Sequence, residues 1–225
     1  MEYDGLILVD KPSGWSSFDV VAKIRGVLKH ETGRKIKVGH TGTLDPLATG
    51  LMIVVVGSYC KRAQEFSKLD KTYEVTMKLG ETSTTGDEEG EKTLVSNKRP
   101  CDEHVVGAVK SFVGTIMQTP PAFSAVKIGG KRAYKLAREG KEVVIEPRQV
   151  HINSIIFKNY EFPLVSFVAD VSSGTYIRSL VQDIGEKLEV GAYMSALRRT
   201  KVGTFNLNVD AVDPNNPDLT RIFTA

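Results

Sequence analysis

The sequence predicts an α+β protein, and three observations lead to this class. Short apolar or alternating runs typical of strands, about seven in all, are mixed irregularly with amphipathic helical segments, with no regular strand–helix–strand order. The 225 residues are enough to bury a substantial core without disulfides. Hydrophobic residues make up 41% of the chain, an ordinary share for a globular protein.

The first half of the chain contains strand, helix and strand signals in turn. Residues 5–10 are an apolar run that predicts a short buried strand. Ser16 or Ser17 can cap the helix that follows. Its apolar face would consist of Val21, Ile24 and Leu28. Residues 51–56 are β-branched and continuously apolar, which predicts a strand buried on both faces.

The second half begins with residues 73–79, whose alternation predicts a half-buried strand. Residues 81–103 are acidic and turn-rich, so we expect an exposed loop there, followed by a helix capped by Asp102. Further strands are expected near 143–145, 152–157 and 164–171. The clearest amphipathic helix has its apolar positions at Ile177, Leu180, Val181, Ile184 and Leu188.

Several classes of protein are excluded by composition. The longest apolar run, 51–56, is far shorter than the roughly 18 residues of a membrane span. Cys60 and Cys101 do not have the C-x-x-C spacing, and the four histidines are scattered, so a structural zinc site is not expected. The net charge is only +3, so nucleic-acid binding would need local clusters of charge. We therefore expect a cytoplasmic, reduced, metal-free protein.

A glycine-rich loop at residues 39–50 is the least ordinary segment. It fits neither the Walker phosphate loop nor the dinucleotide fingerprint, but 39–42 match the G-x-x-G of RNA-binding KH modules. Asp45 followed by Pro46 could simply begin a helix. A polar loop held by a rigid buried strand is also a common arrangement for an active site. Both interpretations remain open on this pattern alone.

Two clusters of positive charge stand out. Residues 23–37 contain six Lys or Arg and one acid, Glu31. Residues 119–148, which we call the basic insertion, contain a second cluster interleaved with Tyr134, a composition typical of nucleic-acid surfaces. Within it, residues 127–141 carry six basic residues against one acid, Glu139; the six are Lys127, Lys131, Arg132, Lys135, Arg138 and Lys141. Arg198, Arg199 and Lys201 are predicted to form a solvated face.

Arg178 lies in the first turn of the predicted helix, where the helix dipole disfavours a cation. It therefore needs an anion, which could be a surface Glu or a buried carboxylate such as Asp45. Tyr73 and Leu197 fit apolar positions, so their pattern alone indicates core residues.

Residues 39–51, GHTGTLDPLATGL, resemble the catalytic motif of the TruB family of tRNA pseudouridine-55 synthases. Other segments resemble the family's remaining motifs in the same order along the chain. They are 10–14 (DKPSG), 71–73 (KTY), 119–127 with 132–134 (TPPAFSAVK and RAY), 173–178 (SGTYIR) and 197–200 (LRRT). Each motif is weak alone, but the ordered set covers nearly the whole chain.

The resemblance implies a large mixed β-sheet with helices and loops around a central cleft, and a thumb formed by the basic insertion. It implies isomerisation of a T-loop uridine of tRNA, without cofactor or metal. The implied catalytic residues are Asp45, the essential carboxylate, Tyr73 beside the uracil, and Arg178 paired with Asp45. Lys11, His40, Tyr176 and Leu197 would line or shape the site. The implied RNA contacts are Lys127, Lys131, Arg132, Lys135 and Arg138.

The family usually carries a small C-terminal RNA-binding domain of PUA type, but only eighteen residues follow Leu207. We therefore expect one catalytic domain, residues 1–225, without a PUA domain, and a monomer whose partner is the T-arm of tRNA. Two other functions remain open. A non-catalytic RNA-binding or RNA-chaperone protein would give Asp45 and Arg178 no shared purpose, and a glycoside or nucleoside hydrolase would lack an evident second carboxylate.

Overall fold

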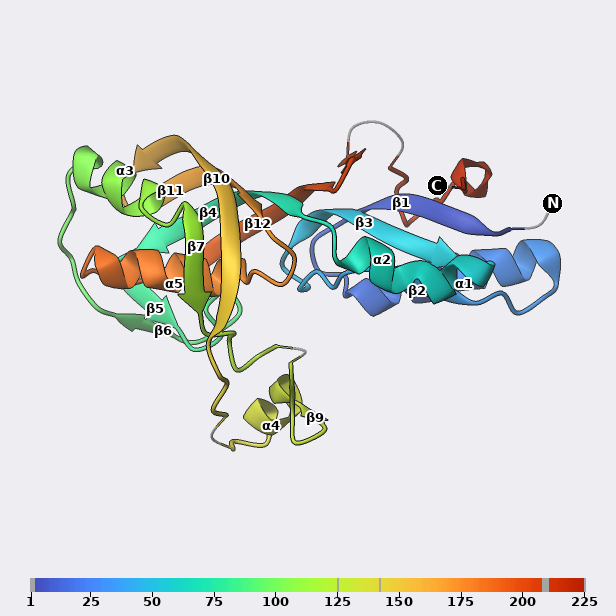
Figure 1. The fold of residues 1–225 in the computed structure, drawn as a ribbon, viewed down its shortest axis with the longest axis horizontal. Helices are drawn as coiled ribbons and strands as arrows, with labels where there is room; N and C mark the ends of the chain where they lie inside the picture. Colours follow the sequence, from blue (N-terminus) through green and yellow to red (C-terminus); the bar gives the residue numbers. More distant parts are fainter. Residues whose placement is uncertain (1–2, 125, 142, 208–210, 225) are drawn as a thin grey trace. The chain divides into compact units, whose positions relative to one another are not determined.

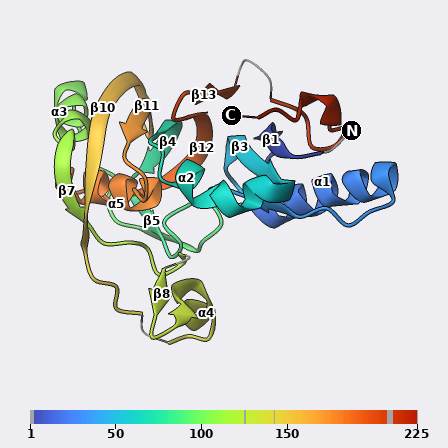
Figure 2. The ribbon, with the colours of Figure 1, turned by 45° about the vertical axis from the view of Figure 1, so that its right-hand side comes forward.

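The computed structural model describes residues 3–124, 126–141, 143–207 and 211–224. These form two compact units, the first from residues 1–74 and 197–225 and the second from residues 75–196 (Figures 1 and 2). Ala125 and Glu142 of the basic insertion, and 208–210 and Ala225 of the C-terminal segment, lie outside the described residues. No helix within the described ranges is long and apolar enough to cross a membrane.

The first unit is built around β3 (Thr49–Val56), the strand predicted to be buried on both faces. β1 (Gly5–Lys11) and β2 (Val38–His40) both pair with it antiparallel. β12 (Ala192–Val202) runs parallel to it, with Arg198 opposite Thr49, and β13 (Phe205–Asn206) pairs with the end of β12. A core cluster contains Leu6, Leu8, Leu51, Ile53 and Val55. The sheet is mixed, which confirms the α+β class.

α1 (Ser17–Thr32) has the cap and the apolar face that its sequence predicts. Ser16 is the N-cap, and its side chain forms a capping box with Asp19. The helix packs beside β2 (Figures 1 and 2). Three short helices, η1 (Gly57–Arg62), α2 (Ala63–Ser67) and η2 (Leu219–Arg221), complete the first unit.

The second unit has the strand order β12-β4-β11-β10-β7. Its strands are β4 (Lys71–Leu79), β7 (Gly114–Gln118), β10 (Arg148–Glu161) and β11 (Leu164–Val171). Its longer helices are α3 (Asp102–Lys110) and α5 (Ile177–Lys187). The apolar face predicted for α5 is buried from Ile177 to Ile184. β4 and β12 contribute residues to both units.

The basic insertion consists of a small hairpin, β8 (Lys127–Ile128) and β9 (Lys131–Arg132), and the helix α4 (Ala133–Arg138) (Figures 1 and 2). Three local predictions are wrong. No strand is formed at 143–145, and Cys101 is the residue at the start of α3, so Asp102 is already helical. Residues 81–103 include the antiparallel pair β5 (Glu81–Ser83) and β6 (Lys92–Leu94), and they are not uniformly exposed.

Candidate active site

The glycine-rich loop lies in the first unit between β2 and β3. No helix begins at Asp45: a hydrogen bond from the Ala48 amide to the Asp45 carbonyl, at 3.1 Å, closes a turn instead. The helix-start interpretation of Asp45 and Pro46 is therefore wrong. Gly50 adopts φ 101°, and a side chain there would collide with the backbone of Arg199 on the parallel strand β12. Glycine is required at this position because the two strands approach so closely.

The backbone on both sides of Asp45 is held by buried polar side chains. The hydroxyl of Ser17 accepts from the Leu44 amide at 2.8 Å and donates to the Leu44 carbonyl at 3.0 Å. The ammonium of Lys11, which is fully buried, donates to the Pro46 carbonyl at 3.1 Å and to the carbonyls of Pro12 and Trp15, in the turn that precedes α1. Asp45 itself is half-buried. The structure thus brings Lys11 to the loop and fixes the chain that carries the carboxylate.

Arg199 provides a third contact to the glycine-rich loop. Its side chain is buried, with only 2% exposed, and donates to the carbonyls of Leu51 at 2.7 Å and Gly42 at 3.2 Å. The prediction of a solvated face is therefore wrong for this residue. Successive side chains of a strand point to opposite faces, so the Arg198-Arg199 pair places one arginine inward. Arg198 is half-exposed and pairs with Asp10 at 2.8 Å, and Lys201 is exposed.

Burial lowers the pKa of the His40 imidazole, and the positive charge of Arg199 lowers it further. The ring is therefore neutral at pH 7, and its Nδ1 is buried with no hydrogen-bond partner among the described residues. Burial also lowers the pKa of Lys71, and the positive charge of Arg199 lowers it further, to about 8. The Lys71 ammonium donates to the Ser67 carbonyl at 2.6 Å. Tyr73, two residues along β4, is buried, and Leu197 is half-buried on β12.

Arg178 lies in the second unit, and its side chain is only 6% exposed. Its guanidinium donates to the carbonyls of Thr85 at 3.0 Å and Phe123 at 2.8 Å. It also faces the buried carboxylate of Asp87, with 3.7 Å between Nη1 and Oδ2. The structure therefore gives Arg178 a buried anion, from a segment that the sequence indicated as an exposed loop. Pairing of Arg178 with Asp45 stays a prediction.

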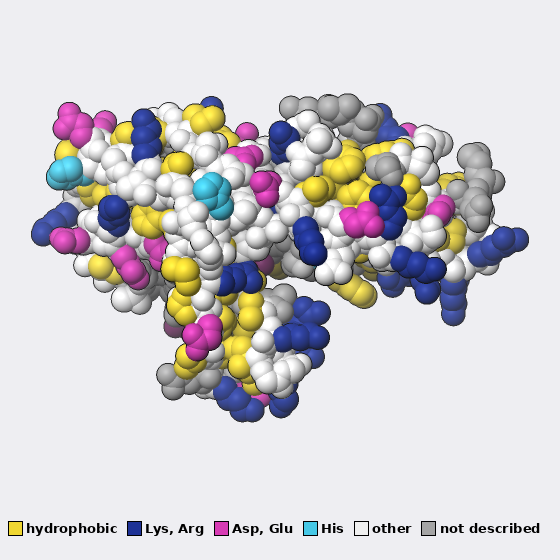
Figure 3. Space-filling view, in the orientation of Figure 1, with side chains coloured by type: hydrophobic (Ala, Val, Ile, Leu, Met, Phe, Trp, Pro, Cys, Tyr) yellow, Lys and Arg dark blue, Asp and Glu magenta, His cyan; other side chains and the backbone are white. Residues whose placement is uncertain are grey.

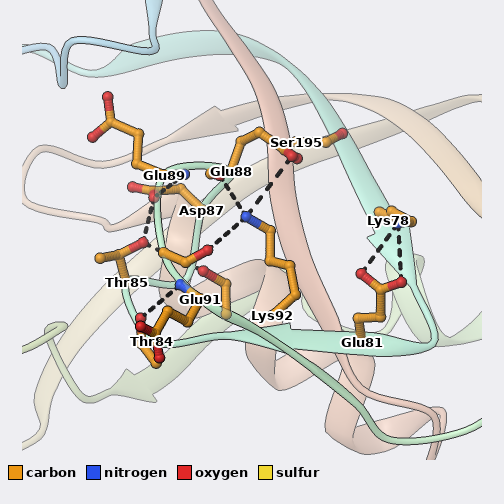
Figure 4. Close-up of polar contacts among 12 residues, drawn as sticks. Lys78, Glu81, Thr84, Thr85, Asp87, Glu88, Glu89, Glu91, Lys92 and Ser195 are labelled. Atoms are coloured by element: carbon orange, nitrogen blue, oxygen red, sulfur yellow. Dashed lines mark hydrogen bonds and ion pairs between the residues drawn. The ribbon is translucent and has the colours of Figure 1, made fainter.

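A dense polar network holds the loop between β5 and β6, residues 84–91 (Figure 4). The ammonium of Lys92 donates to the carbonyls of Glu88 and Gly90 and lies 3.8 Å from the Glu88 carboxylate. Asp87 accepts from the Thr85 hydroxyl and from the Glu89 amide. These contacts fix the loop in a shape that turns Asp87 toward Arg178. Asp87 is one of several acidic residues in this segment, and nothing in the sequence distinguishes it from the exposed ones.

The base of the basic insertion is joined to the start of α5. Gln118 forms two hydrogen bonds with the backbone of Tyr176, at 2.8 and 3.1 Å, and the Ser179 hydroxyl donates to the Thr119 carbonyl at 2.8 Å. The Tyr176 ring has the Arg148 guanidinium 5.1 Å from its centroid. Figure 3 shows dark blue Lys and Arg side chains around the insertion. The exposed ones include all five predicted RNA contacts, Lys127, Lys131, Arg132, Lys135 and Arg138.

Within the described part of the chain, no group of three or more His, Cys, Asp and Glu side chains is arranged to hold a metal ion. The structure brings Lys11 and His40 together with the glycine-rich loop in the first unit, where Tyr73 and Leu197 also lie. Tyr176 and Arg178 belong to the second unit. Ser17, Asp87 and Arg199 were not among the predicted site residues.

Comparisons with known proteins identify the family. Residues 28–177 match the profile described as TruB family pseudouridylate synthase (N terminal domain), and residues 178–214 match the tRNA pseudouridylate synthase B C-terminal domain. The chain belongs to the TruB family of pseudouridylate synthases. A TruB-family chain from Parabacteroides distasonis, named tRNA pseudouridine synthase B, is 44% identical over 91% of this chain and 88% of its own length. A protein of the same name from Chlorobaculum tepidum is 45% identical over 92% of this chain and 88% of its own length.

Solved structures agree with this assignment. The structure titled "Crystal Structure of a Cbf5-Nop10-Gar1 Complex" superposes with a TM-score of 0.73 at 31% identity, covering 94% of this chain. Another, titled "Structure of H/ACA RNP bound to a substrate RNA containing 2'-deoxyuridine", gives a TM-score of 0.70 at 28% identity. The chain spans about half, 52%, of each of those chains. The pseudouridine-synthase fold is confirmed, and membership in the TruB family makes the protein an isomerase.

Proposed function

We propose that this protein isomerises the uridine at position 55, in the T-loop of tRNA, to pseudouridine, with Asp45 as the essential carboxylate. The observation that carries this proposal is the way the glycine-rich loop presents Asp45. The neighbouring backbone is held by Ser17 at Leu44 and by Lys11 at Pro46, while the carboxylate itself remains half-buried. A carboxylate at a fixed place in an RNA-modifying fold suits nucleophilic or base catalysis at a ribose.

The reaction balances without a co-reactant. The N1–C1′ bond breaks, the uracil turns, a C5–C1′ bond forms, C5 loses its proton and N1 gains one. Asp45 acts either by attacking C1′ or by removing the 2′ proton to form a glycal. Arg178 would pair with Asp45 and orient it through a planar fork that lysine lacks. No step oxidises, reduces or hydrolyses the substrate, so no cofactor or metal is proposed.

The target base must leave the folded T-loop before it can react, which costs on the order of a few kcal/mol of stacking energy. Tyr73 would stack on the extruded uracil, with Leu197 packed beneath it and Tyr176 shaping the site. The neutral imidazole of His40 would occupy the space that the base leaves. The lowered pKa of His40 supports this role, because an uncharged ring stacks without carrying a proton into the site.

The decisive experiment incubates the pure protein, in EDTA and without cofactor, with an unmodified tRNA transcript. Pseudouridine is then mapped by a method that reads single positions. A transcript with cytidine at position 55 is the matched control. We expect pseudouridine at position 55 only. Release of free uracil would indicate a hydrolase, and binding without conversion would indicate a non-catalytic RNA-binding protein.

The exposed cations of the basic insertion are proposed to bind phosphates of the T-arm. Each phosphate neutralised contributes roughly 0.7 to 0.9 to the slope of log affinity against log salt. The Lys131→Ala/Lys135→Ala pair should therefore flatten this slope by about 1.4 to 1.8. The single-turnover rate at saturating RNA should change little, because these groups position RNA and do not reach the reacting sugar. An unchanged slope would exclude both residues from the interface.

A further inference from the structure

An exposed aromatic ring stands at the start of α1. Phe18 is 65% exposed. The other exposed large hydrophobic residues in the described part of the chain are all non-aromatic. A single exposed apolar residue is ordinary and by itself indicates nothing. Phe18 differs in two respects: its neighbour Ser17 binds the glycine-rich loop, and exposed cations follow it along the same face of the helix.

The backbone at Phe18 is held beside the loop that carries Asp45. Its neighbour Ser17 makes both hydrogen bonds to the Leu44 backbone, at 2.8 and 3.0 Å. The capping box of Ser16 and Asp19 fixes the first turn of the helix around it. Phe18 therefore directly follows Ser17, whose side chain binds Leu44, the residue before Asp45. Because the backbone that carries the ring is already ordered, less entropy is lost when the ring receives a flat ligand.

Two cations lie on the same face of α1 as Phe18. Ala22, Arg25 and Lys29 follow Phe18 at i+4, i+7 and i+11, so they lie on one face, and all three are exposed. The Arg25 guanidinium donates to the Val38 carbonyl at 3.1 Å, which ties this face to β2. Three further exposed cations follow between the helix and β2, namely Arg34, Lys35 and Lys37.

These cations lack the carboxylate partners that cations elsewhere in the chain possess. Arg62, Lys78 and Arg221, for example, each pair with an acid three positions away. Among the described residues, no acid is paired with Lys29, Arg34, Lys35 or Lys37. The acids nearby serve other groups, since Asp19 caps α1 and Glu31 accepts from the Tyr3 hydroxyl at 2.8 Å. Figure 3 shows dark blue side chains over α1.

We propose that Phe18 is a stacking platform for an unpaired base of the RNA loop that enters the site. Lys29 and Lys37 bind phosphates of the same RNA. This proposal rests on the proposed function, because it names the contact that the substrate loop makes beside Asp45. An exposed aromatic ring and exposed cations on one surface are the combination by which proteins bind unpaired nucleic acid, because the ring stacks on a base and the cations bind phosphates. A helical duplex offers phosphates but no free base.

The experiment compares binding of a T-arm stem-loop with binding of a blunt duplex of the stem alone. Phe18→Ala should weaken stem-loop binding about tenfold, change duplex binding by less than about twofold and leave the salt slope unchanged. Phe18→Trp should restore binding of the stem-loop. The Lys29→Ala/Lys37→Ala pair should flatten the salt slope for both RNAs by about 1.4 to 1.8.

Leu94→Ala is the matched control, because Leu94 is 62% exposed but lies in the second unit. Its stem-loop affinity should equal that of the wild type. A fluorescent base analogue in the RNA loop should be quenched by the wild type and by Phe18→Trp, but not by Phe18→Ala. Equal affinities for Phe18→Ala and Leu94→Ala would overturn the proposal. Wild-type conversion of the same stem-loop is measured in parallel, so failure of the proposed function would appear as absent product and not as an unchanged affinity.

Discussion

Two loops of this protein each carry one aspartate next to buried cations, and they use it differently. In the glycine-rich loop, Lys11 and Arg199 bind backbone carbonyls, and Asp45 stays half-buried. In the 84–91 loop, the carboxylate of Asp87 is itself the group that faces the buried Arg178. The loop that carries Asp45 is thus anchored at backbone carbonyls on both sides of that residue. A loop fastened by its carboxylate uses that charge to compensate a buried cation.

The largest expected effect comes from Asp45→Asn, which keeps the shape of the side chain but removes its charge. Because the loop is held by its backbone, we expect the fold to survive while the single-turnover rate falls by at least about a thousandfold. RNA affinity should change by less than about tenfold, or 1.4 kcal/mol. Quench-flow and filter-binding measurements check both. A variant that keeps a few per cent of the rate would remove Asp45 from the chemistry.

Arg178→Lys is expected to have the next largest effect. Lysine keeps the charge but cannot donate to Thr85 and Phe123 through one planar group, so the cation should move relative to the loops it contacts. We expect the rate to fall about a hundredfold, because small displacements in an active site have effects of that size. Circular dichroism should remain that of the wild type. Near-normal rates would show that the fork geometry is dispensable.

Asp87→Asn tests the structural half of the comparison. Both side chains of the Arg178–Asp87 pair are buried, so removing one charge should lower the free energy of unfolding by about 3 kcal/mol. Asp10→Asn is the matched control, because the Arg198–Asp10 pair is 38% and 39% exposed. That variant should lose less than about 1 kcal/mol. Urea titrations of the two variants should thus differ clearly, and equal losses would contradict a special role for the buried pair.

Arg199→Met should have a smaller effect on stability than Asp87→Asn. It leaves the carbonyls of Leu51 and Gly42 without this donor, which should cost about 2 kcal/mol. Lys201→Met, on the same strand but exposed, is the control and should be neutral. Loss of the Arg199 charge should also let the pKa of His40 rise toward its usual value, which NMR titration of the imidazole would reveal. An unshifted pKa of His40 would mean that the charge of Arg199 does not act on that imidazole.

The sequence predicted what short-range patterns determine. The capping serine of α1, the buried strand at 51–56 and the apolar face of α5 all follow from spacing within one element. Residues 143–145 are apolar and β-branched, yet they form no strand, because a strand also needs a partner for its backbone. Local pattern does not specify that partner.

The candidate site divides in the same way. The glycine-rich loop was recognised because its residues are contiguous in the sequence. Asp87 was not, because its partner Arg178 is remote in the chain and its neighbours are ordinary exposed acids. Arg199 was missed because two adjacent arginines indicate an exposed surface. Only when residues 198–199 are known to lie in a strand does it follow that one of the two side chains points inward. Residues whose roles depend on distant partners required the folded chain.

The most direct test of this account measures the single-turnover rates of Asp45→Asn and Asp87→Asn side by side, on the same tRNA and at saturating enzyme. Each rate is divided by the fraction of that variant that is folded under the assay conditions. We expect Asp45→Asn to be fully folded and to form no detectable pseudouridine, whereas folded Asp87→Asn forms it slowly but to completion. If both variants were folded and equally inactive, the two carboxylates would share one role, and the distinction between the two loops would be wrong.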